Sequence, residues 1–71
     1  MKTVTSTMAG TVFKVLANAG DEVTAGQTLI VLESMKMEIP VDAEFGGKVA
    51  EVLVSEGDFV NEGDALVHFE E

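Results

Sequence analysis

The segment "AGTVFKVLANAGDEVTAGQTLIVLE" at residues 9–33 is the main clue to the architecture, because it repeats without a gap as "GGKVAEVLVSEGDFVNEGDALVHFE" at residues 46–70. The offset is 46 minus 9, or 37, and it aligns Gly20 with Gly57 and Asp21 with Asp58. Extended in both directions, the same offset makes residues 1–34 repeat as residues 38–71. The sequence therefore predicts a single domain over 1–71, built from two similar halves that are joined by an unpaired segment at 35–37.

Each half has the pattern of short β-strands. Runs rich in valine, leucine, isoleucine and threonine are broken by a Gly-Asp pair and by a second glycine six residues later, which is typical of strands separated by turns. Helical periodicity is not sustained anywhere. Two halves that each have an apolar side would bury those sides against each other. We therefore expect an all-β sandwich or flattened barrel with approximate two-fold symmetry.

This symmetry predicts where the unpaired segment lies. If a tight hairpin brings Ser34 close to Glu38, the two-fold operation brings their equivalents, Glu71 and Met1, close to each other at the opposite end. Side chains in a two-residue hairpin turn project away from the sheet. The sequence thus predicts that Lys36 is an exposed amine at the tip of a hairpin, far from both termini.

Composition excludes several classes of function. Thirteen acidic residues against four lysines give a formal net charge of -9, which argues against a nucleic-acid partner and favours a soluble monomer. The chain has no cysteine, so it lacks thiol chemistry and is compatible with a reducing compartment. Its apolar runs are too short to span a membrane, and we expect a cytoplasmic protein. The lone histidine, His68, is expected to be a strand residue and not a catalytic one.

An exposed lysine is a poor catalyst but a good attachment point. Schiff-base and general-base lysines need burial or a neighbouring cation to become neutral amines, whereas a modifying enzyme can supply its own base and an activated acyl group. The pattern alone also permits a purely structural role, in which Met35 and Met37 cover the end of the core. Two features favour function: residues 35–37 are the only break in the repeat, and exposed methionines usually meet a partner.

The segment "ESMKM" at residues 33–37 resembles the acceptor motif of the biotinyl and lipoyl attachment domains, usually written Glu-Ala-Met-Lys-Met. The resemblance extends over nearly the whole chain. "TMAGTV" (7–12) is similar to the opening segment of that family, and "AGDEVTAGQTL" (19–29) and "EGDFVNEGDAL" (56–66) are similar to its two Gly-Asp-x-Val-x-x-Gly turns. The family fold implied is a flattened barrel of two four-stranded antiparallel sheets related by a pseudo-two-fold axis. The sequence departs from the pattern at Ser34, where alanine is usual, and at Ala9, where proline is common.

The resemblance implies a carrier and not an enzyme. It assigns covalent biotin to Lys36, attached by a biotin protein ligase, and it assigns recognition by the ligase or a partner to four flanking residues, namely Glu33, Ser34, Met35 and Met37. The tethered biotin would carry carboxyl groups between the active sites of a biotin-dependent carboxylase or decarboxylase. The repeats align without the inserted thumb of one class of bacterial carriers, and no linker rich in proline and alanine precedes them. We therefore expect a stand-alone, thumbless carrier.

Two other functions remain open from the sequence. The same lysine could carry lipoate, attached by a lipoyl ligase, and dual modification is a variant of this hypothesis; lipoyl acceptors, however, more often have Asp-Lys-Ala where this chain has Met-Lys-Met. The domain could also be an unmodified interaction module that docks through its methionine tip. No constellation of catalytic residues supports an enzyme.

Overall fold

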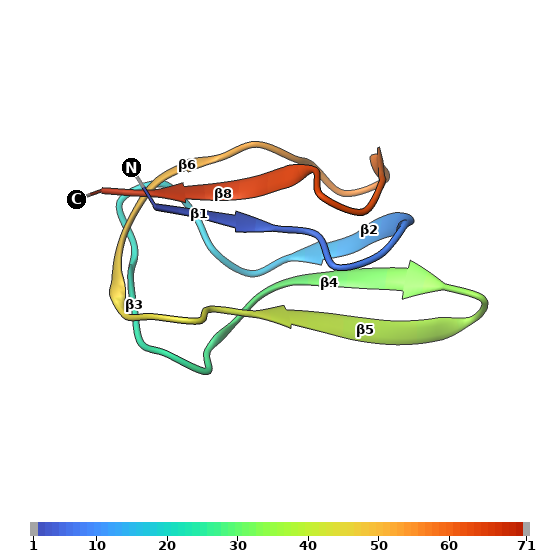
Figure 1. The fold of residues 1–71 in the computed structure, drawn as a ribbon, viewed down its shortest axis with the longest axis horizontal. Helices are drawn as coiled ribbons and strands as arrows, with labels where there is room; N and C mark the ends of the chain where they lie inside the picture. Colours follow the sequence, from blue (N-terminus) through green and yellow to red (C-terminus); the bar gives the residue numbers. More distant parts are fainter. Residues whose placement is uncertain (1, 71) are drawn as a thin grey trace.

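The computed structural model describes residues 2–70, and within them it shows eight β-strands and no helix. The strands form two four-stranded antiparallel sheets packed face to face in an elongated molecule of 34 × 18 × 17 Å (Figure 1). The strands are β1 (Lys2–Thr5), β2 (Gly10–Val15), β3 (Glu22–Val23), β4 (Thr28–Ser34), β5 (Met37–Asp42), β6 (Gly47–Val52), β7 (Phe59–Val60) and β8 (Ala65–Phe69). The predicted all-β fold and its two four-stranded sheets are confirmed.

The strand orders of the two sheets are images of each other. One sheet has the order β1-β8-β6-β3 and the other β5-β4-β2-β7. Adding the 37-residue offset turns β1, β2, β3 and β4 into β5, β6, β7 and β8, so the operation exchanges the two sheets. Each sheet takes two strands from each half of the sequence. The halves are therefore interleaved, which the repeat alone did not specify.

The loops obey the same symmetry, down to single hydrogen bonds. The Gly20 amide donates to the Val49 carbonyl, and its equivalent Gly57 donates to the Val12 carbonyl, both at 2.8 Å. Both glycines have positive φ, 94° and 93°, a conformation that side chains disfavour. These bonds tie each Gly-Asp turn to a strand of the other half. Glycine repeats at this position because both turns need the same positive φ where they contact the other half.

The core lies between the two sheets. Its largest fully buried side chains come from the central strands β2, β4, β6 and β8 and from the edge strand β7, and they are Val12, Leu29, Ile30, Leu32, Val49, Val60, Leu66, Val67 and Phe69. The Phe69 ring packs edge-on against the half-buried Phe45, with ring centroids 4.9 Å apart. Burial of one such side chain stabilises the fold by roughly 1.5–3 kcal/mol. The sheets stay open at their edges, so the molecule is a sandwich and not a closed barrel.

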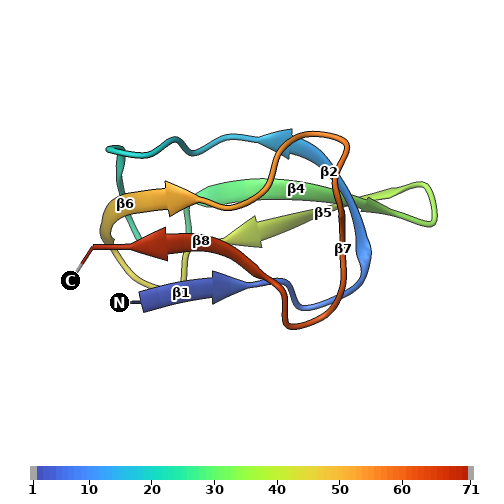
Figure 2. The same cartoon turned by 90° about the horizontal axis from the view of Figure 1, so that it is seen from above.

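The hairpin of β4 and β5 extends beyond the sandwich at one end (Figure 2). The described ends of the chain lie at the other end, where Lys2 and Phe69 are register partners. The predicted proximity of Met1 and Glu71 concerns residues outside the described part of the chain. The placement of their neighbours agrees with the symmetry argument.

Candidate functional site

The turn between β4 and β5 has two residues, Met35 and Lys36. Ser34 pairs with Met37 across the two strands, and the two turn residues have φ of 53° and 66°. Positive φ at both central positions is the pattern of a type I′ hairpin turn, which normally selects asparagine and glycine. A left-handed conformation costs a side-chain-bearing residue roughly 1–2 kcal/mol. Such backbone strain is typical of functional segments.

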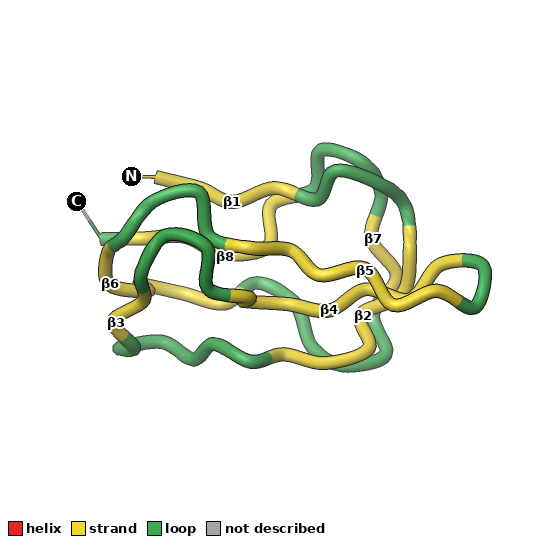
Figure 3. Tube along the Cα trace, turned by 90° about the horizontal axis from the view of Figure 1, so that it is seen from below, coloured by secondary structure: helices red, strands yellow, loops and turns green. Residues whose placement is uncertain are grey.

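The tip of this hairpin is open to solvent while its base is firmly held. Lys36 is exposed, Met35 is 92% exposed and Met37 is 64% exposed. A few residues earlier on β4, Leu32 and Ile30 are fully buried in the core. In Figure 3 the tip forms a loop that projects past the rest of the trace. The fold therefore presents the Lys36 amine at the exposed tip of a hairpin whose base is anchored in the core.

Gly10 allows the hairpin base to pack closely against β2. A Cβ at this position would lie 3.0 Å from the carbonyl oxygen of Glu33 and 3.6 Å from the Cβ of Ser34. The first distance is shorter than ordinary van der Waals contact. The absence of a side chain at Gly10 thus sets the position of the two residues that lead into the turn.

The other three lysines lie near an aromatic ring or opposite a residue of a neighbouring strand. The Lys2 ammonium lies 4.8 Å from the centre of the Phe45 ring, and the Lys14 ammonium lies 5.6 Å from that of Phe13. Such cation–π contacts are attractive. Lys48 faces Glu22 across a pair of strands. Lys36 differs from all three because it stands at the tip of the hairpin.

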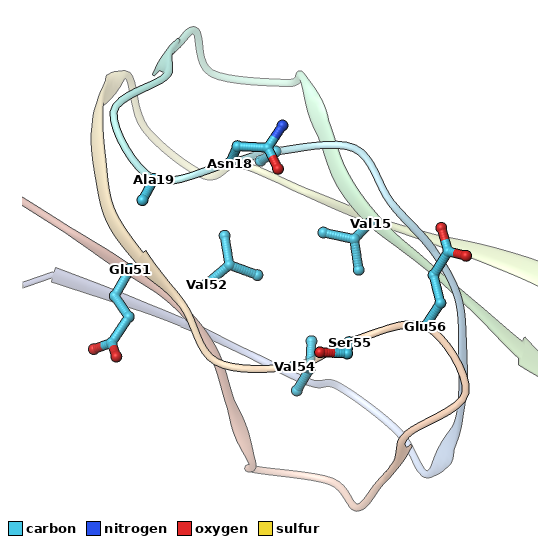
Figure 4. Close-up of a pocket in the computed structure, with 9 residues that line it drawn as sticks. Val15, Asn18, Ala19, Glu51, Val52, Val54, Ser55 and Glu56 are labelled. Atoms are coloured by element: carbon cyan, nitrogen blue, oxygen red, sulfur yellow. The ribbon is translucent and has the colours of Figure 1, made fainter.

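A groove of about 610 Å³ lies away from the hairpin, between the ends of β2 and β6 and the loops that follow them. Figure 4 shows Val15 and Val52 pointing into it from opposite sides. These valines are repeat equivalents, as are Asn18 and Ser55, which also line it. The groove is therefore the place where the two equivalent strands diverge about the pseudo-two-fold axis, and it contains no residue of the predicted site.

The residues singled out from the sequence are brought together at one end of the molecule. Glu33 is exposed on β4, Ser34 is half-buried, and Met35, Lys36 and Met37 follow directly. His68 lies on β8, where its Nδ1 is 2.9 Å from the hydroxyl of Thr3. Sequence reasoning overlooked Glu38 and Phe59, which are exposed near the hairpin. The repeat could have drawn attention to Phe59, because an aromatic residue stands there where the equivalent position in the other half has the charged Glu22.

Within residues 2–70, neither a metal centre nor a membrane-spanning helix is found. No three acidic, histidine or cysteine side chains in this range gather as metal ligands would. The same range holds no helix long and apolar enough to cross a bilayer. The hairpin is therefore the strongest candidate site in the described part of the chain.

Comparison with known sequences connects this geometry to one family. The model of a family described as "biotin-requiring enzyme" matches residues 2–69. A biotin/lipoyl attachment protein of Bacillus subtilis is 55% identical over 65 residues, which cover 92% of this chain and 89% of that protein. A biotin carboxyl carrier protein of Streptococcus mutans is 46% identical over 65 residues, which cover 92% of this chain but only 50% of the relative.

Solved structures share the fold. A single-chain, multi-domain long-chain acyl-CoA carboxylase matches 93% of this chain with a TM-score of 0.88 and 38% identity, over 7% of its own length. The lipoyl domain of the 2-oxoglutarate dehydrogenase complex from Azotobacter vinelandii matches 96% of both chains, with a TM-score of 0.77 and 28% identity. The fold thus occurs both as a small part of a carboxylase and as a lipoyl domain.

Proposed function

This chain belongs to the biotin-requiring enzyme family, and we propose that it is a biotin carrier protein with Lys36 as its covalent attachment site. The observation that carries the proposal is the turn itself. Two residues with side chains hold positive φ at the exposed tip of a well-anchored hairpin. A turn chosen for stability alone would place asparagine and glycine there. The residues at the tip are thus better explained by what the lysine carries.

The hairpin supplies the nucleophile for attachment. In a ligase active site, a base removes a proton from the Lys36 ammonium, and the free amine attacks the activated carbonyl carbon of biotin. A C–N amide bond forms, and the activating group leaves with the electron pair of the bond that breaks. The structure fits this step, because an exposed primary amine on a narrow projection can enter the active site of another protein.

The domain contributes position and not catalysis. Bound biotin supplies the chemistry of accepting and releasing a carboxyl group, while the core-anchored β4–β5 hairpin holds the tether at one end of the molecule. Tethering makes each encounter with a partner active site effectively intramolecular and so raises the local concentration. Relatives that are carriers support this non-enzymatic role.

Homologous domains occur within carboxylases, which supports a biotin-dependent carboxylase as a partner of this chain, with a decarboxylase as a second member of the same class. A biotin protein ligase is required by the attachment chemistry.

We further propose that the domain acts as a monomer in the cytoplasm. The net charge of -9 opposes self-association, and the lack of cysteine suits a reducing compartment.

Lipoate on the same lysine is the second candidate. It is favoured by the structural match to a lipoyl domain and by the biotin/lipoyl attachment protein of Bacillus subtilis. A lipoyl ligase would then modify Lys36, and dual modification is a form of this candidate. Met35 and Met37 favour biotin, because they match the biotin acceptor motif.

A reconstitution experiment separates these candidates from an unmodified docking module. The purified protein is incubated with a biotin protein ligase, biotin and ATP, or with a lipoyl ligase, lipoate and ATP, and its intact mass is followed over time. We expect rapid and complete biotinylation and slower or no lipoylation. Lipoylation that outpaces biotinylation would reverse the order of the two candidates, and a mass that stays unchanged in both reactions would refute covalent carriage.

A further inference from the structure

Four exposed residues form a row across the outer face of the sheet that carries the hairpin. Glu38 on β5 pairs with Glu33 on β4, Glu33 with Thr11 on β2, and Thr11 with Phe59 on β7. All four side chains are exposed. We call these residues, Glu38, Glu33, Thr11 and Phe59, the docking row.

The docking row breaks two rules of sheet stability. Glu33 and Glu38 lie directly opposite each other, and like charges in such a pair are destabilising. Phe59 is 65% exposed on a two-residue edge strand, where an apolar side chain gains little from burial. Local rules that a fold breaks without a structural benefit often mark a functional surface.

The other sheet provides an internal comparison. The repeat places Glu70, Lys48 and Glu22 where the docking row has Glu33, Thr11 and Phe59. Lys48 pairs with Glu22, and its carbonyl accepts a hydrogen bond from the Glu70 amide at 2.8 Å. A lysine thus lies between two glutamates in the equivalent row, and no aromatic ring is exposed there. A lysine between the glutamates is therefore compatible with this fold, whereas the docking row has the uncharged Thr11 at the equivalent position.

We propose that the docking row is the surface on which the biotin protein ligase binds this domain, with Phe59 in an apolar pocket and the Glu33–Glu38 pair against one or more cationic side chains of the ligase. This inference rests on the proposed function of Lys36. It extends the recognition surface from the acceptor motif to Glu38 on the returning strand and to β7, which lies more than 20 residues later in the sequence.

Reach favours the ligase over the carboxylase as the partner of this surface. An unmodified lysine side chain extends only about 6 Å from Cα to Nζ, so the ligase must approach the body of the domain. The docking row begins two residues from the turn, about 7 Å along the strands, and Phe59 lies two strands across from Glu33, about 10 Å away. A ligase that holds the amine in its active site covers this area. After attachment the longer tether lets a carboxylase bind the cofactor from farther away.

The test is steady-state biotinylation of purified variants by the ligase, with carrier concentration varied. We expect Phe59→Ala and the double variant Glu33→Gln/Glu38→Gln each to raise KM for the carrier about tenfold, with kcat nearly unchanged. We also expect KM of the wild type to rise with salt, and this dependence to be weaker in the double variant. Far-ultraviolet circular dichroism verifies that each variant is folded.

The matched control is on the opposite sheet. Glu22→Phe places an exposed phenylalanine at the symmetry-equivalent position, and it should leave KM within about twofold of the wild type, whereas Phe59→Glu should raise it. If wild-type Lys36 is biotinylated and the docking-row variants match its KM, the docking row is wrong while carriage on Lys36 stands. If the variants are impaired only in carboxyl transfer after modification, the surface belongs to the carboxylase and the ligase assignment is overturned. If the wild type is not modified at all, the proposed function itself fails.

Discussion

At the scale of single residues, Lys36 is distinguished from the other lysines by its position and not by its type. Lys36→Arg keeps the positive charge and the exposed position, but the guanidinium does not deprotonate in proteins and offers no neutral amine. We expect biotinylation to disappear and the free energy of unfolding to stay within about 0.5 kcal/mol of the wild type, as for most surface substitutions. Lys14→Arg is the matched control and should be modified normally. Residual label in Lys36→Arg would place the acceptor elsewhere.

Met35 and Met37 are expected to act in recognition and only weakly in stability. Their side chains are 92% and 64% exposed, so truncation to alanine should cost well below the roughly 2–5 kcal/mol of a buried methionine. Flexible thioether side chains can adapt to the surfaces of both the ligase and the carboxylase, so modification should suffer more. Thermal melting of each alanine variant, beside its biotinylation rate, measures both effects. A large loss of melting temperature at an unchanged rate would make these methionines core residues.

At the scale of the hairpin, stability and function oppose each other. Replacing the turn by Met35→Asn/Lys36→Gly supplies the residues that a type I′ turn prefers. These residues tolerate the positive φ that Met35 and Lys36 now adopt, so the conformational cost of the turn falls. We expect the free energy of unfolding to rise by about 1–2 kcal/mol, measured by urea denaturation, while acylation is lost with the amine. Lys36→Arg keeps the strained turn and should show no such gain. An equal or lower stability of the Asn-Gly variant would mean that the native turn is not strained.

The elements also show how far the sequence could predict this structure. The repeat identified two equivalent halves and isolated residues 35–37, because glycine and aspartate turns leave a strong periodic signal. It did not reveal that β1 pairs with β8 while β2 pairs with β4 and β7, since the choice of partner strands depends on how the halves interleave. For the same reason the sequence did not predict that Glu38 and Phe59 lie in one row, because that row depends on the order of β5, β4, β2 and β7 in the sheet.

At the scale of the whole molecule, attachment changes the charge. The amide removes the positive charge of Lys36, so the formal net charge moves from 4 minus 13, or -9, to 3 minus 13, or -10. We expect the modified protein to migrate ahead of the unmodified protein on a native gel, because the added group is small and the fold is unchanged. Equal mobility of the two forms, each verified by mass, would contradict amide formation at an amine.

The most direct measurement is peptide mapping by mass spectrometry of the protein purified from its natural host, together with its intact mass. Carriage on Lys36 predicts one biotin adduct per chain, located on the peptide that contains Met35, Lys36 and Met37, with Lys2, Lys14 and Lys48 unmodified. An adduct on any of those three lysines, or a chain that remains unmodified in a host whose other carriers are biotinylated, would contradict it.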